Sequence, residues 1–333
     1  MKDPKMPDFS EPVTPEPEGV SAFAARVLNQ LSLSAWLPAT FLTLGLTFLL
    51  KFRKIGSLNV ARAATELTNK DGIWGLALLA VPTLVVATLL TQAFAFESIQ
   101  LLEGYWHRRG PAQWLARVLI RWQVKRKNRL DRLAKAAARA AFRESKDRWK
   151  VDTPKDVIKA LELASRGKDF PEHLDSKVGE LEWSDRCRPE ALRRVEGLVR
   201  ARADYPVENR ILPTRLGNVL RSAEDGLRNT QGNLGTFVMR CRPLVPISVR
   251  AQHDQFRTRL EMYCTLVFVA LTLTVASIVI LWPLGLEQVA IAPTMFMAVC
   301  FTSYHAAIAS ARGYGVTLGF MDDAYEASQP TKG

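Results

Sequence analysis

Between Met262 and Arg312 the sequence carries one acidic or basic residue besides a histidine, Glu287. A membrane-spanning helix needs about 20 apolar residues to cross roughly 30 Å of hydrocarbon. The segments 264–284 and 289–311 both meet this requirement, and Trp282-Pro283-Leu284-Gly285 between them has the composition of a turn. A soluble helical hairpin of this length would show a charged face, and neither segment has one. We therefore predict two membrane-spanning helices joined by a tight turn.

Two further apolar segments, 31–50 and 73–96, precede this hairpin. Charged residues follow both segments, and Tyr105 and Trp106 supply an aromatic belt after the second. Residues 1–30 begin with a proline-rich stretch that has little to bury, which is typical of a disordered tail. The predicted fold is all-α: a polytopic membrane protein with two transmembrane hairpins (31–97 and 261–312), a helical insert (98–260) and a C-terminal tail (313–333).

The insert is strongly basic. Residues 98–260 hold 35 of the 45 Lys/Arg and 20 of the 33 Asp/Glu, whereas the turn between the last two spans has no Lys or Arg. Positive flanking segments stay on the cytoplasmic side of a membrane. We therefore expect the insert and both termini to be cytoplasmic in a cell (inner) membrane, although the 51–72 loop, with five Lys/Arg, would then lie outside.

Helical patterns dominate the insert, and no alternation typical of a strand occurs. The segment Gln113–Lys150 lacks Gly and Pro and predicts one long helix. Thr153 with Pro154 predicts a helix start capped by the threonine. Further helices are expected over 185–203 and from 211 onward. Residues 242–246 predict an extended connector, after which Ser248 can cap a helix that runs into the third span.

Three segments together resemble a known group: Leu101–Trp106, Leu212–Asp225, and Tyr304–Ala307 with Tyr314-Gly315. The combination resembles uncharacterised bacterial four-span integral membrane proteins, in which two spans, a cytoplasmic insert and two further spans follow one another. The run Leu-Pro-Thr-Arg-Leu-Gly-Asn at 212–218 is the most specific part. The resemblance implies the four-span topology and no activity.

Catalytic and metal-binding signatures are absent from the sequence. There is no phosphate-binding loop ending in Gly-Lys-Ser/Thr, no His-Glu-x-x-His and no Gly-x-Ser-x-Gly. The four cysteines form no C-x-x-C pair, and we expect free thiols. Asp322, Asp323 and Glu326 could attract a cation, but a solvated tail explains them more simply. We expect no cofactor, no metal and no enzymatic activity.

Small and polar residues recur along the last span at helical spacing: Thr294, Ala298, Thr302 and His305. Small side chains let membrane helices approach closely, and hydroxyls can bond across the gap. The same stripe could instead line a pore. His305 is an ionisable group inside a span, which marks a functional suspect, although its closeness to Arg312 allows it to reach the interface.

Basic side chains near the second span predict contact with anionic lipid of the inner leaflet; they are Arg108, Arg109, Arg121, Lys125, Arg126 and Lys127. Nucleic acid is also a polyanion but lies farther from a membrane-tethered helix. A solvated helix face explains the same pattern.

A further apolar face, made of Leu216, Val219 and Leu220, either packs in the core of the insert or binds a partner helix. From these features we expect a membrane-anchored interaction or scaffold module that self-associates and binds an unidentified protein partner. The alternative is an oligomeric channel or transporter lined by the small and polar stripes.

Overall fold

The computed structural model describes residues 33–55, 83–106, 111–149, 153–166, 168–169, 171–180, 184, 187–229, 233–284 and 286–328. Helices are the only regular secondary structure among these residues, which include no strand. The chain divides into two compact units, Met1–Gln92 and Ala93–Gly333. The predicted loop 51–72 and the tail 1–30 lie almost entirely outside the described residues.

In the first unit, α2 (Leu33–Ile55) covers most of the first predicted span. The hydroxyl of Thr43 donates to the carbonyl of Ala39, and the rings of Phe48 and Phe52 lie 5.6 Å apart on one side of the helix. Only the second half of the second predicted span, from Thr83 onward, is described. The helix Thr83–Ala93 is followed, after a 40° bend, by α5 (Ala95–Glu103).

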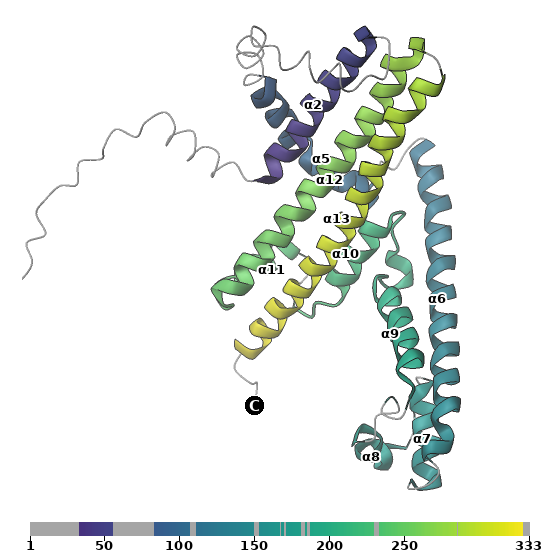
Figure 1. Cartoon of the computed structure of the whole chain (residues 1–333). Helices are drawn as coiled ribbons and strands as arrows, with labels where there is room; N and C mark the ends of the chain where they lie inside the picture. The colour runs from purple at the N-terminus through teal and green to yellow at the C-terminus, as the bar shows by residue number, and fades with distance from the viewer. Residues whose placement is uncertain are drawn as a thin grey trace, which may run out of the picture. The chain divides into compact units, whose positions relative to one another are not determined.

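The second unit is built around two long helices. Helix α12 (Ile247–Leu281) and helix α13 (Leu286–Ser328) run side by side and are joined by η3 (Trp282–Leu284) (Figure 1). Both are long and apolar enough to cross a membrane, and the bent pair that ends in α5 would add a third crossing only if its two helices form one span. The prediction of membrane-spanning helices joined by a turn at 282–285 is thus supported for this pair; four spans are not established.

Helix α13 extends well past the predicted end of the last span. Asp322 is buried in this extension, where it accepts hydrogen bonds from the backbone N–H of Arg228 (2.8 Å) and the amide of Asn229 (3.0 Å). The interpretation of this acidic cluster as a solvated tail is therefore wrong for Asp322.

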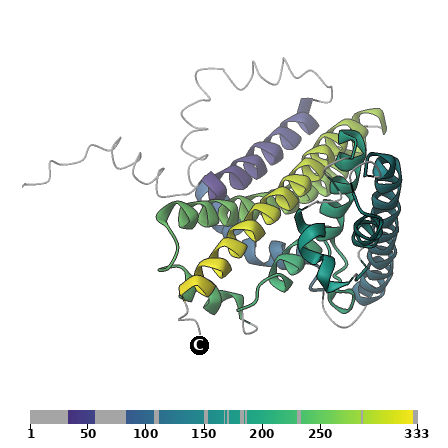
Figure 2. The same cartoon turned by 90° about the horizontal axis from the view of Figure 1, so that it is seen from below.

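The insert consists of helices, as the sequence predicts. They are α6 (Pro111–Trp149), α7 (Lys155–Ser165), η1 (Glu172–Leu174), α8 (Asp175–Glu180), α9 (Pro189–Ala203), η2 (Glu208–Arg210), α10 (Arg215–Asp225) and α11 (Leu234–Cys241). The single long helix expected over 113–150 is confirmed as α6. In both views α9 and α10 lie between α6 and the α12–α13 pair (Figures 1 and 2).

Local details of the insert differ from the prediction at three places. Pro246, not Ser248, precedes α12, and no side chain caps that helix. Pro154, not Thr153, is the residue that precedes α7, and no side chain caps that helix. The segment expected to be an extended connector at 242–246 instead follows α11 as a series of turns, because the backbone N–H of Leu244 bonds back to the carbonyl of Cys241.

The main apolar core joins α5, α10, α12 and α13. Its buried residues are Leu102, Leu216, Val219, Leu220, Leu260, Cys264, Val267, Ala307, Ile308 and Ala311. The hypothesis that Leu216, Val219 and Leu220 form a partner-binding face is therefore wrong. These three side chains are at most 9% exposed because the long helices already cover them.

We expect Leu216→Ala to lower the free energy of unfolding by about 2–5 kcal/mol, the usual cost of a cavity at a fully buried leucine. Val199→Ala on exposed α9 surface should change it by less than about 0.5 kcal/mol. Denaturant titration of the purified chain in detergent compares the two. Equal effects would show that α10 does not pack as described.

Candidate functional site

The segment Asp204–Asn218 is the point at which α5, α6, α10 and α13 meet, and we call it the junction. It contains the Leu-Pro-Thr-Arg-Leu-Gly-Asn run of the resemblance. Several of its polar groups bond to residues far away in the sequence. The junction therefore connects the basic insert to the long apolar helices.

The start of α10 is fixed by the side chains of Thr214 and Asn218. The Thr214 hydroxyl accepts a hydrogen bond from the Gly217 N–H (3.0 Å) and donates one to the carbonyl of Glu103 (3.0 Å). The Asn218 amide bonds to both backbone groups of Leu212, at 2.7 and 3.0 Å. A buried asparagine with paired donor and acceptor fixes one conformation of the chain before the helix.

Two glycines permit the close approach of α10 to α5. A Cβ atom on Gly217 would lie 2.0 Å from the carbonyl oxygen of Glu103, a backbone atom that cannot move aside. Gly104 ends α5 at a φ of 94°, in the left-handed region, where glycine is favoured. The ring of Pro213 packs directly on Gly104. These contacts explain why glycine is required at both positions.

Helix α6 is bound to the junction by its buried polar face. The Gln123 amide donates to the Pro213 carbonyl (3.3 Å) and accepts a bond from the Tyr205 hydroxyl (3.0 Å). The ammonium of Lys127, a residue 5% exposed, donates to the Pro206 carbonyl (2.9 Å). Burial raises the pKa of Tyr205, and nearby Arg126 opposes this shift.

Asp204 is the central charge of the junction. Its side chain is 6% exposed and receives two hydrogen bonds from Arg312 of α13, at 2.8 and 2.6 Å, and one from Arg215 of α10, at 3.2 Å. A buried carboxylate requires such compensation, and removal of one partner from a buried pair costs several kcal/mol. Asp204 thus links the end of α9 to both α10 and α13.

Glu103 is a second, half-buried acid, seven residues after the end of the predicted second span. Burial raises the pKa of its carboxyl group from 4.5 to about 7, Glu224 adds to the shift and Arg221 opposes it. A carboxyl group with a pKa near neutrality changes charge under physiological conditions.

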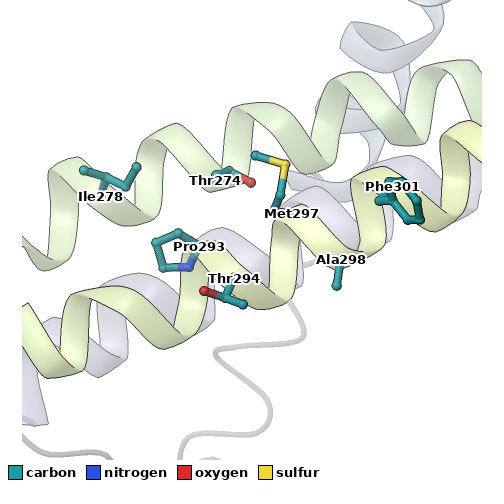
Figure 3. Close-up of a pocket in the computed structure, with 7 residues that line it drawn as sticks. All are labelled: Thr274, Ile278, Pro293, Thr294, Met297, Ala298 and Phe301. Atoms are coloured by element: carbon teal, nitrogen blue, oxygen red, sulfur yellow. The ribbon is translucent and has the colours of Figure 1, made fainter.

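A groove lies between α12 and α13 in their apolar halves (Figure 3). It has a volume of about 590 Å³, and Met297 extends toward α12 beside Thr274. The lining residues are Thr274, Ile278, Pro293, Thr294, Met297, Ala298 and Phe301. Two members of the predicted stripe, Thr294 and Ala298, belong to this lining.

The whole predicted stripe lies on the exposed side of α13. Thr294, Ala298, Thr302 and His305 are exposed, whereas Ala307 and Ala311 on the other side of the helix are buried in the core. The hydroxyls of the two threonines bond to carbonyls of their own helix. His305 stacks edge-on against Phe301, with ring centroids 4.4 Å apart. The stripe therefore takes no part in the main core between α12 and α13.

The predicted lipid-facing basic residues separate into three groups. Arg108 and Arg109 lie outside the described residues. Arg121 and Lys125 are exposed on α6, and the Arg126 guanidinium lies over the ring of Trp122. Lys127 is a correction, because it is buried against Pro206 and cannot meet a lipid headgroup.

Within the described parts of the chain, no three His, Cys, Asp or Glu side chains are grouped so that they could hold a metal ion. No protein-family model matches the chain, nor does any curated protein or solved structure.

Sequence reasoning found the 212–218 run but not its partners. Glu103 and Thr214 are 111 positions apart, so only the folded chain brings them together. The buried face of α6 carries Gln123 and Lys127 at an i, i+4 spacing. Because both side chains are polar, the sequence gave no indication that this face packs on the junction.

Gly217→Ala should lower the free energy of unfolding by about 1–3 kcal/mol, because the new methyl group collides with a backbone oxygen. Gly197→Ala is the matched control, since nothing lies within 4 Å of its Cβ position in α9. Alanine there should stabilise the helix by about 0.5–1 kcal/mol. Thermal unfolding in detergent measures both variants, and a stabilising Gly217→Ala would contradict the close approach.

The free energy of unfolding should contain a pH-dependent contribution from Glu103. Because the native state binds the proton more tightly than the unfolded chain, this contribution falls as the pH rises from 4.5 to about 7. Glu103→Gln, which resembles the protonated form, should match the wild type at pH 4.5 and exceed its melting temperature at pH 8. Glu172→Gln, a change at an exposed position, is the control. Equal melting curves for the wild type and the Glu103→Gln variant at pH 8 would refute the raised pKa.

Proposed function

We propose that this chain is a multi-pass membrane protein that serves as a non-enzymatic interaction or scaffold module and self-associates in the membrane. The observation that carries the proposal is the outward face of α13. At its centre lie the small and polar residues Thr294, Ala298, Thr302 and His305, which are exposed although the helix is apolar enough to span a bilayer.

The flanks of this face favour a helix as its partner. The large side chains of Ile291, Met295 and Phe301 are 46%, 64% and 64% exposed and border the stripe. Small residues between larger ones form a depression into which a second helix can fit closely. The groove beside Thr294 and Ala298 enlarges this depression. A second copy of the chain would carry the same complementary surface.

The topology that we propose has four spans, 31–50, 73–96, 264–284 and 289–311, in a bacterial inner membrane. The basic insert 98–260 and both termini are placed in the cytoplasm by the positive-inside rule. Anionic lipids of the inner leaflet are the expected neighbours of the exposed cations Arg121 and Lys125. Nucleic acid is a less favourable partner for a surface held at a membrane.

The junction supports a scaffold because it fixes the insert relative to the long helices. Asp204 and Tyr304 connect insert segments to α13, and Gln123 connects α6 to the same place. A rigidly held cytoplasmic domain can present the same surface to a protein partner in every copy of an oligomer. That partner surface is not assigned to particular residues.

Ala298→Leu should shift the purified protein from an oligomer to a monomer, because the larger side chain fills the depression. Val279 on α12, whose side chain is 70% exposed, supplies the control. Val279→Leu should leave the oligomer intact. Native mass spectrometry in detergent gives the mass of both variants.

A wild-type chain that is strictly monomeric in detergent and in vesicles would refute self-association. Protein-dependent ion flux across vesicles, lost in Thr302→Leu, would instead favour the alternative of an oligomeric channel or transporter lined by the stripe.

A further inference from the structure

The first three turns of α6 carry an exposed aromatic face. Trp114, Val118 and Trp122 follow one another at i, i+4 and i+8 and are 65%, 42% and 53% exposed. An amphipathic helix on a soluble domain normally turns such a stripe to its core. Here the opposite side, with Gln123 and Lys127, packs on the junction. The described structure leaves the aromatic stripe without cover.

The charge around this stripe has one sign. Residues 111–130 contain six Lys/Arg and no Asp/Glu. Arg121 and Lys125 fall within about 60° of Val118 around the helix axis, at 100° per residue, and are exposed. Tryptophan together with flanking cations is the composition that favours the boundary between lipid headgroups and hydrocarbon.

Hydrogen bonds show which part of α13 lies at the same level as this stripe. Gln123 donates to the carbonyl of Pro213. Leu216 follows Pro213 by three residues, and its N–H donates to the hydroxyl of Tyr304 (3.3 Å). Gln123 and Tyr304 therefore lie at a similar level. The irregular polar junction bonds to α13 at Tyr304 and Arg312 and cannot lie in hydrocarbon. The cytoplasmic boundary of the fourth span is therefore near Tyr304, before the predicted end at 311.

The two helices run in the same direction from this level. Beyond Gln123, Lys127 bonds to Pro206, and beyond Tyr304, Arg312 bonds to Asp204, two residues from Pro206. Residues of α6 that precede Gln123 consequently rise beside the part of α13 that precedes Tyr304. Twelve helical residues extend about 18 Å, and one leaflet of hydrocarbon is roughly 15 Å thick.

We propose that the segment Pro111–Trp122 is an anchor embedded in the inner leaflet, with Trp122 near the headgroups and Trp114 deeper among the acyl chains. Arg117 and Arg121 extend along the stripe so that their guanidinium groups reach lipid phosphates, as long cationic side chains do near a membrane boundary. This inference rests on the proposed function only in that α13 must span the membrane; it needs no self-association.

The bilayer is favoured over a protein or nucleic acid as the occupant. The level of the stripe coincides with a membrane-spanning part of α13, and the flanking charge matches anionic headgroups. A nucleic acid would have to enter the hydrocarbon to reach Trp114. The proposal therefore commits to lipid.

Spin labels in the full-length chain test this proposal. Val118→Cys carries the label at the stripe, and Ala136→Cys is the matched control, because 18 residues are five helical turns and the exposed Ala136 lies on the same face. Val279→Cys in α12 reports on the span itself. All three are made in a chain with Cys187→Ser and Cys300→Ala, whose remaining thiols, Cys241 and Cys264, are buried.

The chain is reconstituted in vesicles of phosphatidylglycerol and phosphatidylcholine, and collisions of each label with oxygen and with a water-soluble nickel complex are measured. We expect the oxygen-to-nickel ratio at position 118 to approach that at 279 and to exceed that at 136 several-fold. A ratio at 118 equal to that at 136 would overturn the anchor while leaving the span intact. Exclusion of both reagents at 118 would show protein cover and overturn it as well. Nickel access at 279 would overturn the span and the anchor together.

Discussion

The contact between the Glu103 carbonyl and the first turn of α10 is the constraint on which the second unit depends. A hydroxyl from Thr214 satisfies that carbonyl, which stands at the end of α5, and Gly217 allows the two backbones to meet. The approach brings Leu216 into the core shared with α12 and α13. Without it, the apolar face of α10 and the ends of the long helices would be exposed to water.

Charged and polar side chains stabilise the same part of the molecule, the junction. The buried carboxylate of Asp204 is paired with two partly exposed arginines from different helices, which compensate its charge. Tyr205, Gln123 and Lys127 extend the polar connections to α6. The junction therefore transmits the position of α13 to the long basic helix, and the site of any membrane contact by α6 follows from that geometry.

The sequence predicts the long helices but not their contacts. The absence of Gly and Pro predicts α6, and the apolar segments around 282–285 predict the paired long helices. An apolar face such as that of Leu216 reveals that something covers it, but helical spacing cannot say whether the cover is internal or a partner. Charge was misleading at Lys127, because a buried ammonium bound to a carbonyl looks like an exposed one in the sequence.

Cysteine accessibility in cells that produce the chain tests most directly whether the α12–α13 hairpin crosses a membrane with the insert on the opposite side from its turn. In a chain with Cys187→Ser and Cys300→Ala, Glu287→Cys beside the turn should react with a membrane-impermeant maleimide in intact cells. Lys168→Cys, exposed in the insert, should react only after the membrane is opened. Labelling of both positions in intact cells, or of neither until the membrane is opened, would contradict a hairpin that spans the bilayer.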